Sequence, residues 1–181
     1  RIVILMSVLI TFSAVQASAG VVVGINPVSQ QADLNDTVSV DLIVSGLDSL
    51  DISAFDFDVA YDDSILSFVD YSLGNELGDI AAGDADDFSF GDLGSGVIDL
   101  AEVSYLWDLS SQGDCITAAT LNFTATAEGV SAIDITIDEL GDELAAPVAA
   151  AVANGTVNVV PEPATILLSL AGLGFIRRKR D

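Results

Sequence analysis

Histidine is absent from this chain of 181 residues, and lysine and arginine are absent from residues 2–176. Of the 28 acidic residues, only Glu162 and Asp181 lie outside residues 20–160, which leaves 26 carboxylates in that segment. Such a segment cannot bind nucleic acid through its phosphates, because that binding depends on Lys and Arg. We expect its carboxylates to be solvated, hydrogen-bonded or matched by cations from outside the segment.

The missing basic side chains also exclude most catalytic chemistry. Histidine-based triads, histidine-ligated metals and lysine Schiff bases cannot be assembled from residues 20–160. Carboxylate pairs of the kind used in glycoside hydrolysis remain, but nothing in the sequence selects one pair among so many acids. We therefore predict a protein that is not an enzyme, with a carboxylate-based secreted hydrolase as an alternative.

Cysteine is nearly absent as well. Cys115 is the only one, so an intramolecular disulfide and a zinc site built from Cys and His residues are both excluded. Because Cys115 precedes an apolar run, we expect it to be a buried small hydrophobic residue rather than a reactive thiol.

The first nineteen residues have the composition of a secretory signal peptide. Ile2 to Val15 is apolar apart from three hydroxyl residues, and Ala17-Ser18-Ala19 fits the small-residue pattern before a cleavage site. We predict a signal peptide over residues 1–19, with a few charged residues preceding Arg1. A buried strand and an N-terminal anchor are the alternative interpretations.

The other end of the chain combines three features in a fixed order. Pro161-Glu162-Pro163 comes first, an apolar run of thirteen residues from Ala164 to Ile176 follows, and a basic cluster comes last. As a helix the run would be about 20 Å long, which is short of a hydrocarbon core of about 30 Å. The basic cluster marks the cytoplasmic side of a membrane, so the tail suits a signal that is read and removed.

This tail resembles the PEP-CTERM sorting signal of Gram-negative bacteria. The resemblance implies cutting near the Pro-Glu-Pro motif by an exosortase-type membrane protease, transient membrane association, and a destination in the cell envelope or the exopolysaccharide matrix of a biofilm. The residues that carry it are Pro161, Glu162, Pro163, Arg177, Arg178, Lys179 and Arg180.

Residues 20–160 are dominated by alternation of apolar and polar side chains, which is typical of half-buried antiparallel strands. Turn residues separate the runs, and about nine short strands at this spacing predict a sandwich of two sheets. The least regular stretch, 139–153, is expected to be a short helix or a loop around Pro147. The predicted strands are 21–26, 38–44, 55–61, 66–71, 86–91, 97–105, 120–124, 133–137 and 156–160.

The body of the chain resembles the cohesin domain, a jelly-roll sandwich related to some carbohydrate-binding modules. The resemblance covers roughly residues 21–160 and implies a protein partner of the dockerin kind, bound through one sheet face. Dockerins themselves carry calcium. The segments that carry the resemblance are 55–62, 63–68, 119–125 leading to Gly129, and 154–159.

Two places are candidates for ligands. Asp79 with the acidic segment 83–87 offers oxygen ligands for Ca²⁺, and the alternative is a solvated acidic loop. Trp107, with Tyr105 beside it, ends a predicted strand and offers a ring for stacking on a sugar; the alternative is a large residue that caps the core. The predicted metal ligands are Asp79, Asp84, Asp86 and Asp87.

These observations together predict an all-β protein with three parts. Residues 1–19 are the signal peptide, residues 20–160 form a roughly nine-stranded antiparallel jelly-roll β-sandwich, and residues 161–181 form a sorting signal with a short transmembrane helix. The predicted function is an exported structural or adhesive module that is not an enzyme. The main alternative is a carbohydrate-binding module for extracellular polysaccharide.

Overall fold

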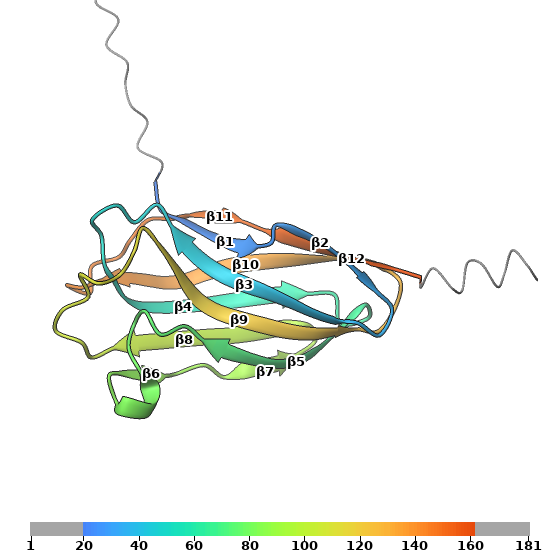
Figure 1. The fold of residues 1–181 in the computed structure, drawn as a ribbon, viewed down its shortest axis with the longest axis horizontal. Helices are drawn as coiled ribbons and strands as arrows, with labels where there is room; N and C mark the ends of the chain where they lie inside the picture. Colours follow the sequence, from blue (N-terminus) through green and yellow to red (C-terminus); the bar gives the residue numbers. More distant parts are fainter. Residues whose placement is uncertain (1–19, 162–181) are drawn as a thin grey trace, which may run out of the picture.

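The computed structural model describes residues 20–161, which form two β-sheets packed face to face (Figure 1). The predicted signal peptide and the predicted sorting helix lie outside the described residues, as do Glu162, Pro163 and the basic cluster. Within residues 20–161 the model contains no helix with the length and apolar character of a membrane span.

Twelve strands make up the two sheets. The smaller sheet has the order β11-β1-β3-β9-β5, from Ala151–Ala153, Val22–Asn26, Thr37–Ser45, Cys115–Ala125 and Leu66–Leu73. The larger sheet has the order β2-β12-β10-β4-β8-β6, from Ser29–Asp33, Gly155–Val160, Gly129–Asp142, Ile52–Tyr61, Val97–Ser104 and Ala85–Asp87. β7 (Gly91–Gly94) also pairs with β8, and a 3₁₀ helix, η1 (Ile80–Ala82), precedes β6.

The core lies between the two sheets and is built from the apolar rows of the strands. Phe55 and Phe57 of β4 stack with their ring centroids 4.9 Å apart, and Phe123 of β9 enters from the opposite sheet. Tyr61 and Phe68 both meet the Phe123 ring edge-on. Alternation therefore turns these strands into two walls with an apolar interior, as a β-sandwich requires.

The predicted sandwich is confirmed, and the strongly alternating runs lie in β3, β4, β9, β10 and β12. Two strands were missed because their pairing leaves little trace in the sequence. β2 is polar and pairs in parallel with β12, and β11 pairs in parallel with β1, each at a sheet edge. An edge strand needs backbone hydrogen bonds but not an apolar row.

Two local predictions were wrong, and a third was right in part. Residues 86–91 do not form one strand, because β6 and β7 pair with different stretches of β8 and residues 88–90 interrupt them. In the stretch 139–153, β10 continues to Asp142 and β11 begins at Ala151, and residues 143–150 between them form the predicted loop around Pro147. Cys115 is exposed rather than buried, because it begins β9 opposite Ser45 and the inward position belongs to Ile116.

Candidate functional site

Trp107 and Tyr105 lie in the loop that connects β8 to β9. Trp107 has a relative exposure of 103%, and Tyr105 is 52% exposed. The Tyr105 hydroxyl donates a hydrogen bond of 2.9 Å to Oδ2 of Asp86. The interpretation of Trp107 as a cap on the core was therefore wrong, and its ring is free to contact a ligand.

Trp107 lines a groove of about 620 Å³ between its own loop and the turn that follows β10. Leu106 and Leu144 add apolar surface, and Leu144 is itself 81% exposed. Two hydroxyl groups of this groove are engaged already: the Ser53 hydroxyl donates to the Asp142 carbonyl, and Oγ of Ser104 accepts from the Leu106 amide at 3.2 Å. The groove therefore offers an aromatic ring and aliphatic surface together with the carboxylate of Glu143.

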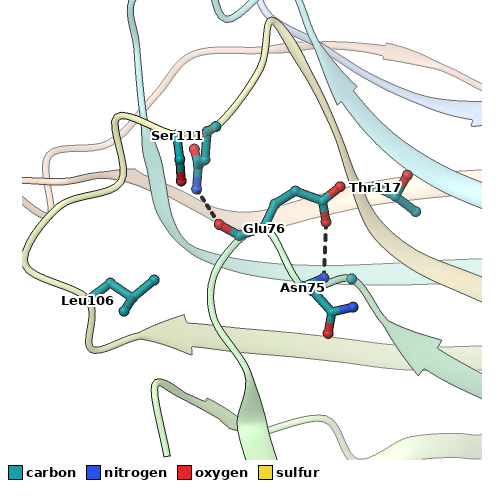
Figure 2. Close-up of a pocket in the computed structure, with 7 residues that line it drawn as sticks. Asn75, Glu76, Leu106, Ser111 and Thr117 are labelled. Atoms are coloured by element: carbon teal, nitrogen blue, oxygen red, sulfur yellow. Dashed lines mark hydrogen bonds between the residues drawn. The ribbon is translucent and has the colours of Figure 1, made fainter. Parts of the chain in front are cut away.

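A second cavity of about 530 Å³ lies on the other side of the same loop (Figure 2). Nε2 of Gln112 donates to the carbonyl groups of Glu76 and Ile52, and Oε1 of Gln112 accepts from the Ile52 amide. Gln112 thus ties the loop to both sheets. Gly74 and Thr117 line this cavity where the two chain segments pack closely. A Cβ at position 74 would collide with the Thr117 carbonyl oxygen, so the position requires glycine.

The four predicted calcium ligands are not gathered into one site. Oδ1 of Asp79 accepts from the Ala81 amide at 2.8 Å and begins η1. Asp86 is bonded by Tyr105, and Asp87 accepts from the Tyr71 hydroxyl at 2.9 Å and from the Ser89 amide. Among residues 20–161, no group of three or more Asp, Glu, His or Cys side chains has an arrangement that could hold a metal ion.

A crowded acidic face on the larger sheet was not predicted from the sequence. Asp58 of β4 stands directly opposite Asp99 of β8, and Asp56 stands opposite Glu139 of β10. Burial raises the pKa of Asp56 and of Asp58, and repulsion from Asp99 and Asp138 raises both further. The alternation of Asp56 and Asp58 with Phe55 and Phe57 placed these acids on an outer face, but only strand pairing brings the acids of β8 and β10 beside them.

This face is short of hydrogen-bond donors. Oδ1 of Asp56 is buried without a partner, and the carboxylate of Asp58 accepts no hydrogen bond within the described chain. Asp99 accepts one from the Phe90 amide at 2.6 Å. Half-buried carboxylates with so few donors are complementary to a cationic surface.

No protein-family model matches this sequence, and no curated protein matches it. Solved structures do match the fold. The sixth cohesin of scaffoldin B from Acetivibrio cellulolyticus, in complex with a Cel5 dockerin mutant, is 23% identical with a TM-score of 0.63. The match covers 78% of this chain and 99% of that cohesin.

Cohesins from other organisms match equally well. The seventh ScaB type I cohesin of Pseudobacteroides cellulosolvens is 16% identical with a TM-score of 0.62, and the match covers 79% of this chain and 94% of that one. A non-cellulosomal cohesin from the archaeon Archaeoglobus fulgidus is 15% identical with a TM-score of 0.60, over 81% of this chain and 96% of that one. Residues 20–161 therefore have the fold of a cohesin domain.

Proposed function

We propose that residues 20–160 form a non-enzymatic binding module that docks a protein partner on the outer face of its larger sheet. The observation that carries this proposal is the cluster of Asp56, Asp58 and Asp99, which crowds half-buried carboxylates on a face that no other layer of the domain covers. A cohesin of the same fold was solved with a dockerin bound, which supports a protein partner.

The partner face is expected to be rich in Lys and Arg. Those side chains would supply the charge and the hydrogen-bond donors that residues 20–160 lack. Arg is the better match for paired carboxylates such as Asp58 and Asp99, because its guanidinium presents several donors in one plane. Electrostatic attraction of this kind speeds association and weakens as salt is added.

The module is proposed to act outside the cell. The support comes from the sequence ends, namely the signal-peptide composition of residues 1–19 and the Pro161–Pro163 motif with its apolar run and basic cluster. An exosortase-type protease would remove the tail and release the domain to the envelope or the exopolysaccharide matrix. Intact mass of the protein from its native host is expected to lack Arg177 to Arg180.

Binding to the acidic face is tested with a pair of matched variants. Partners are isolated from the host's extracellular fraction, and the affinity of the recovered protein is then measured for the wild type and two variants. Asp56→Asn/Asp58→Asn/Asp99→Asn is expected to lose at least about tenfold in affinity, which is 1.4 kcal/mol. Asp41→Asn/Asp70→Asn, which neutralises the outer face of the smaller sheet, is the control and should bind normally. Equal affinity of the triple variant and the wild type would refute the proposal.

A second candidate function is carbohydrate binding in the groove at Trp107. The full exposure of the Trp107 ring beside that groove favours it, because aromatic rings stack on flat ligands. Trp107 is the only tryptophan of the chain, so its fluorescence reports on the groove directly. Exopolysaccharide fragments should shift that emission, and Trp107→Ala should weaken binding by about 1–3 kcal/mol, by analogy with stacking of bases on aromatic side chains. If the emission does not respond to any fragment, carbohydrate binding in this groove is refuted and only the protein-partner proposal remains.

A further inference from the structure

Glu102 of β8 is a carboxylate buried inside the sandwich. Its exposed fraction is 1%, and neither Oε1 nor Oε2 has a hydrogen-bond partner. It continues the inward row of Ile98 and Leu100, so its side chain points toward the core rather than toward the outer face. On β4 the residue paired with it is Phe55, which offers no donor.

The charged groups around Glu102 are all acidic. Asp87 is paired with it on β6, and Glu76, in the connection that follows β5, repels it as well. Tyr71 of β5 donates its hydroxyl to Asp87 and not to Glu102. Burial, followed by repulsion from Asp87 and Glu76, raises the pKa of Glu102 to about 7.

Protonation is the way in which the Glu102 carboxylate can be neutralised at this position. Both oxygens of Glu102 lack solvent-accessible surface, so they are screened from bulk water and from hydrated cations. An ionised carboxylate without a partner in such a place is strongly unfavourable, and the group takes up a proton or finds a way to water.

Residues 74–87 are the connection that passes beside Glu102. This segment leaves β5, the edge strand of the smaller sheet, and reaches β6, the edge strand of the larger sheet that pairs with β8 at Glu102 (Figure 1). Leu77 and Ala85 of the segment are fully buried. The two ends of the segment are tied to other elements: the Gly74 amide donates to the Ala118 carbonyl, and the Tyr105 amide donates to the Asp84 carbonyl. Between these ends, the backbone hydrogen bonds of residues 77–83 stay within the segment, as in the bonds of Gly78 to Asn75 and of Gly83 to Ile80.

We propose that Glu102 is a proton-controlled latch: the protonated side chain keeps residues 74–87 closed over the end of the core, and the ionised side chain opens that segment. The latch lies apart from the acidic outer face, so it does not depend on the proposed partner. The closed state is fully favoured only in acidic surroundings, and the open state gains population as the pH rises from about 4.5 to about 7.

Hydrogen exchange of residues 20–161 in the full chain tests the latch. Wild type and Glu102→Gln are compared at the same pH, because the amide chemistry then cancels. Below about pH 4, where Glu102 is protonated whether the segment is closed or open, the amides of Gly78, Ala82, Gly83 and Asp84 should exchange equally in both proteins. The excess exchange of the wild type should grow between the ordinary glutamate pKa of 4.5 and the raised pKa of about 7 and then level off. At pH 8.5 a pKa difference of about 2.5 units corresponds to about 300-fold faster exchange in the wild type. Glu128→Gln, at an exposed turn, is the matched control and should behave as the wild type does.

Two further measurements keep the latch falsifiable if Glu102→Gln folds poorly. The carboxyl carbon of Glu102 in the wild type should titrate with a midpoint near 7, and Asp87→Asn should lower that midpoint because it removes a negative neighbour. A midpoint below about 5, which is the range of an ordinary glutamate, would overturn the latch. Equal exchange in wild type and Glu102→Gln at pH 8.5 would overturn it as well, as would acceleration spread evenly over β9, which indicates global unfolding.

Discussion

On the outer face of the smaller sheet, Asp41 accepts a hydrogen bond of 2.7 Å from Thr120, and Asp70 accepts one of 2.7 Å from Asn122. Each donor stands directly across the strand pair from its acid. On the larger sheet Asp58 instead faces Asp99 on one side and Thr136 on the other, and it accepts no hydrogen bond from either. Both faces carry acids, but Asp41 and Asp70 each have a donor opposite them, whereas Asp58 has none.

The difference shows how a chain without basic residues can be both stable and adhesive. Where an opposing Thr or Asn donates a hydrogen bond to Asp, the charge is satisfied within the domain, and that acid has little to offer a partner. Where Asp stands opposite Asp, repulsion is retained in the folded state, and a cationic partner can relieve it. Asp134 fits the first pattern although it belongs to the larger sheet, because Asn154 donates to it at 2.7 Å.

The comparison presumes that β4 contributes packing on one side and charge on the other. Phe57 lies between Asp56 and Asp58 and is fully buried. Phe57→Ala should therefore lower the free energy of unfolding by about 3–5 kcal/mol, since it leaves a cavity in the core. Urea unfolding followed by circular dichroism measures this; a loss below about 1 kcal/mol would mean that the two sheets do not pack around this ring.

The hydrogen bonds of the smaller sheet should stabilise the fold measurably. Asp41→Ala should lower the free energy of unfolding by about 1 kcal/mol, because the Thr120 hydroxyl loses its acceptor. A double-mutant cycle with Thr120→Val isolates the pair. If the two single changes simply add, the bond contributes nothing and the contrast between the faces fails.

Replacing one of the crowded acids of the larger sheet should change the free energy of unfolding in the opposite direction. Asp58→Asn should raise the free energy of unfolding at pH 7 by about 0.5 kcal/mol, because a like charge opposite Asp99 is removed. The raised pKa of Asp58 sets the pH window. Native Asp58 is fully favourable only below the pKa of the unfolded chain, and its contribution is lost as the pH rises through the higher native pKa.

The stabilisation by Asp58→Asn should accordingly disappear near pH 3, where both states are protonated. Thermal unfolding at pH 3, 5 and 7 resolves the trend. Asp41→Asn serves as the control on the other sheet, and a gain there of the same size as at Asp58 would erase the contrast.

Trp107→Ala should change the free energy of unfolding by less than about 0.5 kcal/mol, because the ring makes no contribution to the core. The native fluorescence should be that of a solvated tryptophan, with red-shifted emission. A large loss of stability, or blue-shifted emission, would show that Trp107 is buried and would contradict this prediction.

The smallest effect concerns calcium. Added salt should raise the melting temperature by screening the carboxylates, and calcium should do no more than sodium at matched ionic strength. The reason is that Asp79, Asp86 and Asp87 are each bonded within the domain. An excess effect of calcium that Asp84→Asn/Asp86→Asn/Asp87→Asn removes would establish the calcium site predicted from the sequence.

Much of the fold was predictable because alternation over β3, β4, β9, β10 and β12 reports directly on which side chains face the core. The missing strands β2 and β11 were not predictable in this way, because they are held by backbone pairing with β12 and β1 at the edges of the sheets. The prediction for Cys115 was wrong for a related reason: an apolar run follows it in the sequence, but its own position at the start of β9 points outward.

The candidate sites show the same division between what local sequence determines and what tertiary structure determines. The sequence alone determined that residues 20–160 hold 26 carboxylates and no basic side chain, and that they form a sandwich with no histidine or lysine chemistry, because composition and alternation are local properties. The sequence did not decide whether Trp107 lies in the core or on the surface. Tertiary structure placed Trp107 in solvent, set Asp58 against Asp99, and turned Glu102 inward beside Asp87. These outcomes depend on strand register between residues far apart in the chain, and register is fixed only when the two sheets close over a common core.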